Sequence, residues 1–305
     1  MSDLNTAIAE YLELRRRLGF KLEETGRLLA DFARYANQHG ATRITTELAL
    51  EWASQPQFSP EWIAERLSAV RLLAVHLQVV DPSVEVPPAD LVVAHRRRVA
   101  PHLFSRDDVA AIVAATTIID PPFRAATFAT LIGLLAVTGL RLGEALRLDR
   151  TDVDFDTGQL TIRLSKFNKN REVPLHPSTV DALGAYDRQR CVAFPKASWF
   201  FASHLGPRLT NTVVYPVFAR LLAAAGIEAQ PRARRPRPHD LRHSFAVETL
   251  TGWYRDGADV EARLPLLSTY LGHLEPTATY WYLSATPELL ALAARRLEAD
   301  TEARP

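Results

Sequence analysis

Two histidines and an arginine lie within five residues of each other near the middle of the second half of the chain. His239, Arg242 and His243 are spaced i, i+3 and i+4, so a helix would carry all three on one face. Guanidinium and imidazole groups together can hold the oxygens of a phosphate. A proline-broken stretch before them is the densest basic region of the chain. Its arginines, which we expect to bind nucleic-acid backbone, are Arg232, Arg234, Arg235 and Arg237.

Another arginine lies in a turn that follows a strongly apolar stretch. Gly139 is expected to end one helix, and Arg141 to begin the next. Glu144 follows Arg141 by three residues. Such a pair is either an exposed ion pair worth a few tenths of a kcal/mol, or a means of holding Arg141 ready for an anion at a helix N-terminus. Taken alone, the segment favours the ordinary ion pair.

A lysine, Lys166, lies at the expected turn of a β-hairpin. Leu160, Ile162 and Leu164 alternate with polar residues, and the alternation resumes at Val173. This pattern predicts a short antiparallel hairpin inside a mostly helical region. Lysines are common at exposed turns, but the tip of a hairpin can also deliver one long cation into a neighbouring groove.

Near the C-terminal end, His273 is followed by two tyrosines, Tyr280 and Tyr282. A single histidine or tyrosine in a helical domain is usually a core or boundary residue. Only the combination with the other segments therefore points to a function. On a helix the two tyrosines point about 200° apart, so one of them alone can face a shared site.

The three histidines also have a spacing that zinc ligands use. His239 and His243 form an HxxxH pair, with His273 as a distant third ligand. The metalloprotease pattern, however, needs a glutamate directly after the first histidine, where this chain has Asp240. Arg242 would also put a fixed cation beside the metal. We therefore expect neither a metal ion nor a cofactor.

The elements that would position these residues fall into two parts. Residues 1–81 contain four segments with apolar residues at helical spacing, separated by glycine and proline, which predicts a small helical bundle. Residues 82–102 hold four prolines around Arg96, Arg97 and Arg98, which predicts an extended linker. The arginine triplet is either a solvated run or a strap along a phosphate backbone.

Residues 103–305 are expected to form a second domain. Ser105 is a suitable N-cap for its first helix, and further helices are predicted at 177–190, 211–225, 239–251, 262–271 and 287–299. The predicted fold class is therefore mainly α with a small antiparallel β-hairpin, an α+β domain. The last helix carries an apolar stripe suited to docking on a neighbouring subunit or on its own domain: Leu289, Leu290, Leu292, Ala293 and Leu297.

Composition limits the class of protein. Hydrophobic residues make up 47% of the 305 residues and charged residues 23%, a globular balance rather than a disordered one. The sequence has no apolar run of 18 residues and no basic–apolar leader, which argues against membrane and secretory proteins. Its single cysteine, Cys191, excludes an internal disulfide framework and is typical of a reducing cytoplasm. The net charge of +1 does not by itself indicate a nucleic-acid binder.

Taken together and in this order, the motifs resemble the catalytic domain of the tyrosine recombinase/integrase family. Arg141 and Glu144 match a TGLRxxE-like turn, and residues 165–175 match a GKGNKxRxVPL-like hairpin. Residues 239–243 match an HxLRH helix. His273 lies in an LGH triplet, nine residues before Tyr282, as in the family. The resemblance covers residues 103 to 300, whereas the helical bundle matches the family's core-binding domain only by position and length.

The resemblance implies a DNA strand cut and rejoined through a 3′-phosphotyrosyl link to Tyr282, without ATP or metal. Arg141, Arg242 and His273 would bind the non-bridging phosphate oxygens. His239 would accept the tyrosine proton, and Lys166 would protonate the departing 5′ oxygen. Glu144 and His243 would support them. The chain departs from the family pattern at Phe167, which replaces the usual glycine after the lysine, and in having a second tyrosine nearby.

The implied partner is double-stranded DNA, clamped between the two domains, with four subunits meeting on two sites through the C-terminal tail. The reaction would serve integration, excision or resolution of a mobile element or replicon. We expect no arm-binding module before the helical bundle. Two alternatives stay open: a monomeric type IB topoisomerase that relaxes supercoils, and a DNA-binding module that has lost catalysis.

Overall fold

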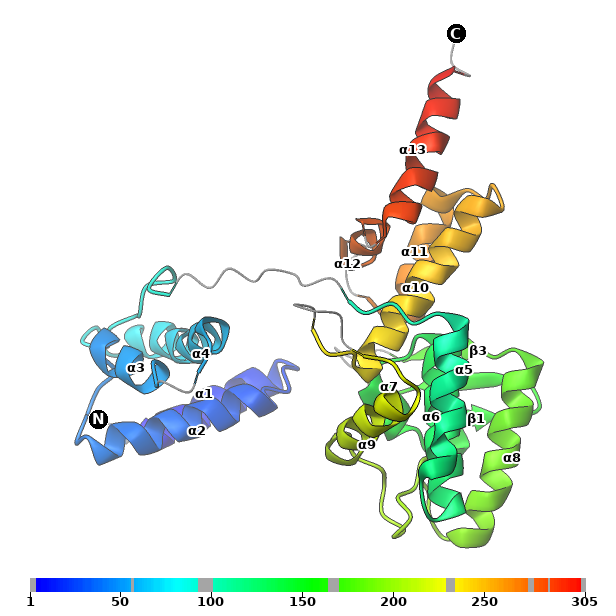
Figure 1. Cartoon of the computed structure of the whole chain (residues 1–305). Helices are drawn as coiled ribbons and strands as arrows, with labels where there is room; N and C mark the ends of the chain where they lie inside the picture. Colours follow the sequence, from blue (N-terminus) through cyan, green and yellow to red (C-terminus); the bar gives the residue numbers. More distant parts are fainter. Residues whose placement is uncertain are drawn as a thin grey trace. The chain divides into compact units, whose positions relative to one another are not determined.

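The computed structural model describes residues 4–55, 58–92, 101–163, 170–228, 234–273, 277–284 and 286–302. The chain forms two compact units, residues 1–98 and residues 99–305 (Figure 1). Both units are built mainly of helices, and the second also contains one small antiparallel sheet. The predicted fold class is confirmed. No helix in the described ranges is long and apolar enough to cross a membrane.

The N-terminal unit contains the four expected helices. They are α1 (Leu4–Arg17), α2 (Glu23–Gln38), α3 (Thr46–Ala53) and α4 (Pro60–Gln78). Side-chain oxygens of Thr45 and Ser59 accept backbone N–H groups at the start of α3 and α4, which satisfies donors that a helix leaves unpaired. At the centre, the ring of Trp52 packs edge-on against Phe32, and the guanidinium of Arg66 lies 3.8 Å above the Trp52 ring.

Part of the expected linker belongs to the N-terminal unit. Val84 is buried in the helical core. Arg71 on α4 donates from Nε to the carbonyl of Pro87 (2.7 Å) and from Nη2 to that of Pro88 (2.6 Å). Proline lacks an N–H group but keeps its carbonyl, so the proline pattern hid this attachment. The arginine triplet 96–98 lies outside the described residues.

The first part of the C-terminal unit contains helices and one short sheet. The helices are α5 (Arg106–Ala114), η1 (Ala115–Ile118), α6 (Pro122–Thr138), α7 (Leu142–Arg147) and η2 (Arg150–Asp152). The strands are β1 (Val153–Asp154), β2 (Gln159–Ile162) and β3 (Arg171–Pro174). They pair antiparallel in the order β1-β2-β3, with Ile162 opposite Arg171 at the base of the expected hairpin. Ser105 caps α5 as predicted.

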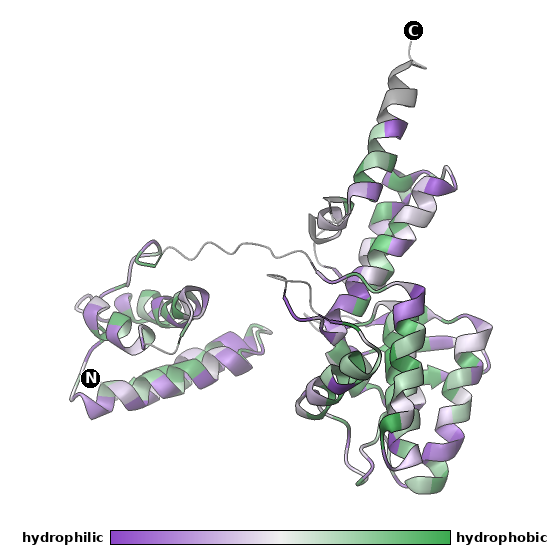
Figure 2. Cartoon of the chain, viewed as in Figure 1, coloured by the Kyte–Doolittle hydropathy of each residue, from purple (hydrophilic) through white to green (hydrophobic). Residues whose placement is uncertain are grey.

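The rest of this unit is helical. Its elements are α8 (Pro177–Ala193), α9 (Asn211–Ala224), α10 (Pro238–Arg255), α11 (Val260–Leu271), α12 (Thr277–Tyr280), η4 (Trp281–Ser284) and α13 (Pro287–Glu302). Helix α6 is central: Leu131 and Leu135 on it are buried, and hydrophobic colouring runs along the α5–α6 region in Figure 2. The sheet packs into the same core through Leu160 and Val173.

The base of the C-terminal tail packs on its own unit. Leu289 is fully buried in a cluster that also contains Leu250, Leu264 and Tyr282. Glu288 on α13 forms an ion pair with Arg255 on α10. Leu290, by contrast, is 51% exposed. The apolar stripe is therefore not one continuous surface. Leu289 packs α13 against its own domain, whereas the neighbouring Leu290 is exposed.

Candidate active site

Three helix ends meet where the predicted site residues gather. Helices α6 and α11 end at Gly139 and Gly272, both in the left-handed conformation with φ of 60° and 70°. Arg141, directly after the first of these turns, is the N-cap of helix α7. A helix C-terminus carries partial negative charge and unpaired carbonyls, so it attracts guanidinium groups. The fold thus concentrates carbonyl acceptors at one point.

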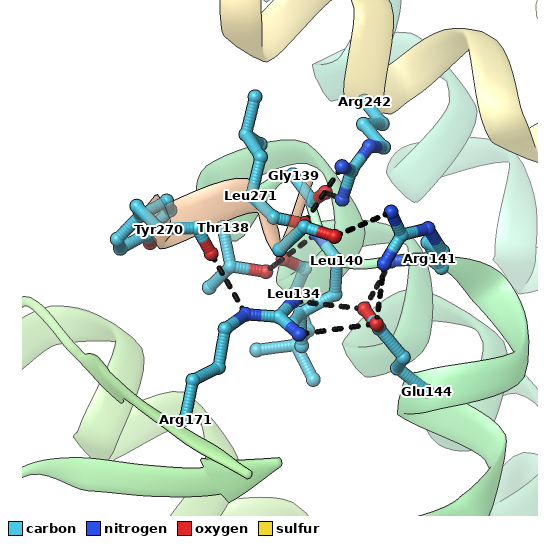
Figure 3. A network of polar contacts seen from close by, with 11 residues as sticks. Leu134, Thr138, Gly139, Leu140, Arg141, Glu144, Arg171, Arg242, Tyr270 and Leu271 are labelled. Carbon is cyan, nitrogen blue, oxygen red and sulfur yellow. Dashed lines mark hydrogen bonds and ion pairs between the residues drawn. The ribbon is translucent and has the colours of Figure 1, made fainter. Parts of the chain in front are cut away.

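Two arginines use those carbonyls as anchors (Figure 3). Arg242 on α10 donates from Nη1 to the carbonyl of Gly139 (2.8 Å) and from Nη2 to that of Leu271 (2.7 Å). Arg141 donates from Nη2 to the carbonyl of Gly272 (2.8 Å). Arg242 is only 1% exposed. Both guanidinium groups are therefore fixed before any ligand arrives.

Glu144 is a buried carboxylate that holds two arginines rather than an exposed partner of one. Its side chain is 1% exposed and accepts from Nη1 of Arg141 (2.8 Å) and from the Arg141 backbone N–H (3.0 Å). Burial raises the pKa of Glu144, but the hydrogen bonds and charge of Arg171, followed by those of Arg141, outweigh it and lower the pKa to about 2. The pair is therefore not an exposed ion pair, and Glu144 holds the guanidinium of Arg141 in place; that Arg141 binds an anion stays a prediction.

Arg171 is a member of this network that the sequence did not single out. It lies on β3 and donates from Nη1 and Nη2 to the two oxygens of Glu144, at 3.1 and 2.9 Å. Its Nε donates to the carbonyl of Tyr270 (2.8 Å). A Cβ on Gly272 would lie 2.8 Å from Nη1 of Arg171, so glycine lets the turn approach the guanidinium. The arginine stands in the quoted hairpin stretch, but its partners are distant in sequence.

The three histidines and Tyr282 pack against one another. The ring of His243 lies 4.8 Å from that of His239 and 5.5 Å from that of Tyr282. The ring of His273 lies 6.0 Å from that of Tyr282, nearly parallel to it, and its Nδ1 is 2.7 Å from Oγ1 of Thr279. Among the described ring pairs, Tyr282 thus contacts His243 and His273 rather than His239.

The electrostatics keep all three histidines neutral near neutral pH. Burial, followed by nearby positive charge, lowers the pKa of His239 to about 4, that of His243 to about 3 and that of His273 to about 4. Burial raises the pKa of Tyr282, while the charges of Arg242 and Arg141 oppose that rise. Neutral imidazoles can accept a proton, and an anion placed among them would favour their charged forms.

The two tyrosines differ in exposure. Tyr282 is 2% exposed and lies in η4, whereas Tyr280 ends α12 and is 54% exposed. Only Tyr282 lies beside the predicted histidines and arginines.

Several predicted residues lie at the approach to α10 or outside the described ranges. Lys166 and Arg232 fall outside them. Arg234 and Arg235 are exposed just before α10, and the backbone N–H of Arg237 donates to Asp240. Within the described ranges, no three His, Cys, Asp or Glu side chains are grouped to hold a metal ion.

Comparison with known proteins identifies relatives of the whole chain. Residues 103–288 match the phage integrase family. The chain is 42% identical to the putative integrase/recombinase y4rB of Sinorhizobium fredii over the full length of both. It is 30% identical to tyrosine recombinase XerD of Bradyrhizobium diazoefficiens, covering 80% of this chain and 78% of that protein.

A solved structure has the same fold. The Tn1549 transposon integrase in complex with transposon right end DNA superposes with a TM-score of 0.68 at 18% identity, covering 97% of this chain and 99% of that one. With the family match over most of the second unit and full-length similarity to y4rB, the chain belongs to the phage integrase family and is a tyrosine-type site-specific recombinase.

Proposed function

We propose that this recombinase breaks and rejoins DNA through a 3′-phosphotyrosyl intermediate on Tyr282. The observation that carries the proposal is the burial of Tyr282 against the rings of His243 and His273, in the field of Arg242, while Tyr280 is exposed. A phenol is a weak nucleophile at its ordinary pKa, so it needs neighbouring cations and a proton acceptor. Both kinds of group surround Tyr282.

The arginines would stabilise the transition state of phosphoryl transfer. Negative charge grows on the non-bridging oxygens as the tyrosine attacks, and guanidinium groups bind such oxygens through paired hydrogen bonds. Arg141 and Arg242 are already anchored on helix-end carbonyls, so little reorganisation is needed. Loss of one donor of this kind typically costs about 3 kcal/mol of barrier, or about a hundredfold in rate.

The tyrosine proton would pass to the histidines. His239 is the acceptor that the sequence motif implies, and the ring of His243 contacts both the ring of His239 and that of Tyr282. We propose that His239 is the final acceptor of this proton and that His243 supports it by contact with Tyr282. His273 would hold a non-bridging oxygen, and Lys166 would protonate the departing 5′ oxygen.

The substrate and setting are inferred from the relatives. The solved Tn1549 integrase is bound to transposon DNA, and XerD is named a tyrosine recombinase. We propose that this enzyme acts in the cytoplasm on double-stranded DNA of a mobile element or replicon, as four subunits on two sites. Arg234, Arg235, Arg237 and the 96–98 triplet would bind the backbone.

Covalent capture tests the proposal. DNA recovered with the denatured protein is sequenced to identify the site, and a nicked duplex carrying that site is then incubated with the enzyme. We expect a denaturant-resistant complex joined through a 3′ phosphate, lost in Tyr282→Phe, retained in Tyr280→Phe and insensitive to EDTA. Loss in Tyr280→Phe alone would move the nucleophile. Relaxation of supercoils without strand exchange between two sites would favour the topoisomerase alternative.

A further inference from the structure

A small cavity of about 60 Å³ lies beside His243, at the start of α10. Its walls include His102 from the start of the second unit, and Arg234, Arg237 and Asp240 from the approach to α10 and its first turn. The proposed function assigns Arg234 and Arg237 to binding the DNA backbone in general, and no proposed chemical step uses a wall residue other than His243. The cavity is therefore a separate feature with its own chemistry.

Three residues that line the cavity each carry a buried nitrogen without a hydrogen-bond partner among the described residues. These nitrogens are Nε2 of His102, Nε of Arg237 and Nδ1 of His243. An unsatisfied buried polar atom costs about 1–3 kcal/mol, so native proteins rarely leave one, and three on one cavity call for an occupant. The Arg237 atom is a donor under all conditions, and each imidazole nitrogen can be one. The missing partner is therefore an acceptor.

The charge in the walls favours an anion over water alone. Arg234 and Arg237 are cationic, and Asp240 is the only carboxylate among the residues that line the cavity. Asp240 already accepts from the backbone N–H of Arg237 (2.7 Å) and lies 3.8 Å from its guanidinium. Burial, followed by the charge of Arg234, lowers the pKa of Arg237, so the two arginines repel each other. An anion in the cavity would relieve that repulsion.

The size fits one oxygen-rich group. A water molecule takes about 30 Å³, so the cavity has room for two waters or for the non-bridging oxygens of one phosphate group. His243 lies between the cavity and the proposed nucleophile in the chain of contacts. It lines the cavity, and its ring lies 5.5 Å from the ring of Tyr282.

We propose that this cavity is a second phosphate subsite, in which Arg234, Arg237, His102 and His243 hold the backbone phosphate next to the one that Tyr282 attacks. The inference rests on the proposed function and extends it by one nucleotide. In this proposal His243 has two contacts. Its ring packs against the ring of Tyr282, and its Nδ1 donates a hydrogen bond to the neighbouring phosphate. Seating the DNA would thereby fix the imidazole that contacts the nucleophile.

Histidine side-chain NMR with inorganic phosphate as the probe tests the subsite without requiring a DNA site. We expect ¹⁵N signals of His102 and His243 to shift saturably in the full-length protein, and the His102 shift to persist in Arg141→Ala, which weakens the main site. The double variant Arg234→Gln/Arg237→Gln should abolish the His102 shift and leave that of His273. His176, an exposed histidine at the start of α8, is the control for folding and bulk salt.

Absence of a His102 shift in the wild type, or its persistence in the double variant, would overturn the subsite and assign the cavity to water. Because no covalent chemistry enters this measurement, its failure is distinct from failure of the proposed function.

A second experiment, with a modified DNA duplex, decides whether the bound phosphate belongs to the DNA backbone. In a duplex carrying the captured site, one methylphosphonate replaces the phosphate beside the cleaved one. We expect it to weaken wild-type binding about tenfold and to have little further effect on the double variant. Equal weakening in both proteins would remove the DNA backbone as the occupant.

Discussion

Arg171 and Glu144 form a two-pronged ion pair in which both terminal nitrogens of the arginine meet both oxygens of the carboxylate. The pair joins β3 to α7, the helix on which Glu144 lies. Glu144 also accepts a hydrogen bond from Arg141, the residue before this helix. The third nitrogen of Arg171 binds the carbonyl of Tyr270, just before the turn that carries His273. One arginine therefore connects the hairpin base with two groups proposed to bind the phosphate.

Arg171→Lys should reduce covalent-complex formation by about tenfold to a hundredfold while DNA binding changes little. Lysine keeps the charge but cannot make the paired contact and reach Tyr270 together, so Arg141 and the turn lose their fixed positions. Single-turnover cleavage at saturating protein measures the chemical step apart from binding.

Arg163→Lys is the control, because Arg163 follows β2 and pairs with the buried carboxylate of Asp152 instead of Glu144. A similar loss of cleavage in both variants would show that the effect comes from the sheet as a whole.

Glu144→Gln should destabilise the C-terminal unit most at neutral pH. The folded pKa is about 2 against an ordinary 4.5, so the carboxylate stabilises the fold above pH 4.5, and this contribution is lost as the pH falls toward 2. The shift corresponds to about 3 kcal/mol. Hydrogen exchange of the α6 and α7 amides, measured across this range, should show the two proteins converge in acid.

Glu172→Gln removes a neighbouring exposed carboxylate on β3 and should change the same amides by less than about 0.5 kcal/mol. A stability gap for Glu144→Gln that stayed constant down to pH 2 would contradict the assigned pKa.

The parts of this site that the sequence predicted are those that local pattern determines. Apolar periodicity located the helices, Gly139 marked the turn before Arg141, and the i, i+3, i+4 spacing put His239, Arg242 and His243 on one face of α10. Tyr282 is buried and Tyr280 exposed, but the choice of Tyr282 as nucleophile, made from its spacing to His273, stays a prediction. None of these inferences needed a contact between distant segments.

The network of Arg171 could not be predicted in this way, because its carbonyl partner at Tyr270 lies 99 residues away. Strand β1 was missed since two residues carry no readable alternation. The packing of residues 82–92 depends on carbonyls accepting from Arg71, which a proline count does not reveal. The placement of Lys166 stays a prediction.

DNA affinity should rise as the pH falls from about 6.5 toward 4. His239, His243 and His273 have pKa values lowered to about 4, 3 and 4, and a bound phosphate would raise them. The complex then holds more protons than the free protein in this window, so lower pH favours binding, by up to about tenfold per pH unit for each proton taken up. Above pH 7 the affinity should be flat.

Fluorescence anisotropy at constant ionic strength measures this dependence. His273→Asn should flatten the curve, whereas His39→Asn, at an exposed position after α2, should leave it unchanged. An affinity independent of pH in the wild type would mean that the histidines stay unprotonated beside DNA.

Leu289 and Leu290 should separate folding from assembly. Leu289 is fully buried in the cluster that contains Tyr282, so Leu289→Ala should destabilise α13 by about 2–5 kcal/mol and lower cleavage even on a half-site. Leu290 is half exposed, so Leu290→Ala should leave the fold and half-site cleavage intact.

If the outer face of α13 docks on a neighbouring subunit, Leu290→Ala should still weaken cooperative filling of a full site and reduce recombination of two plasmid sites. Both are measured by gel shift and by plasmid exchange at matched protein concentration. Full-rate recombination by Leu290→Ala would mean that this residue makes no assembly contact, and the tail would then serve its own domain alone.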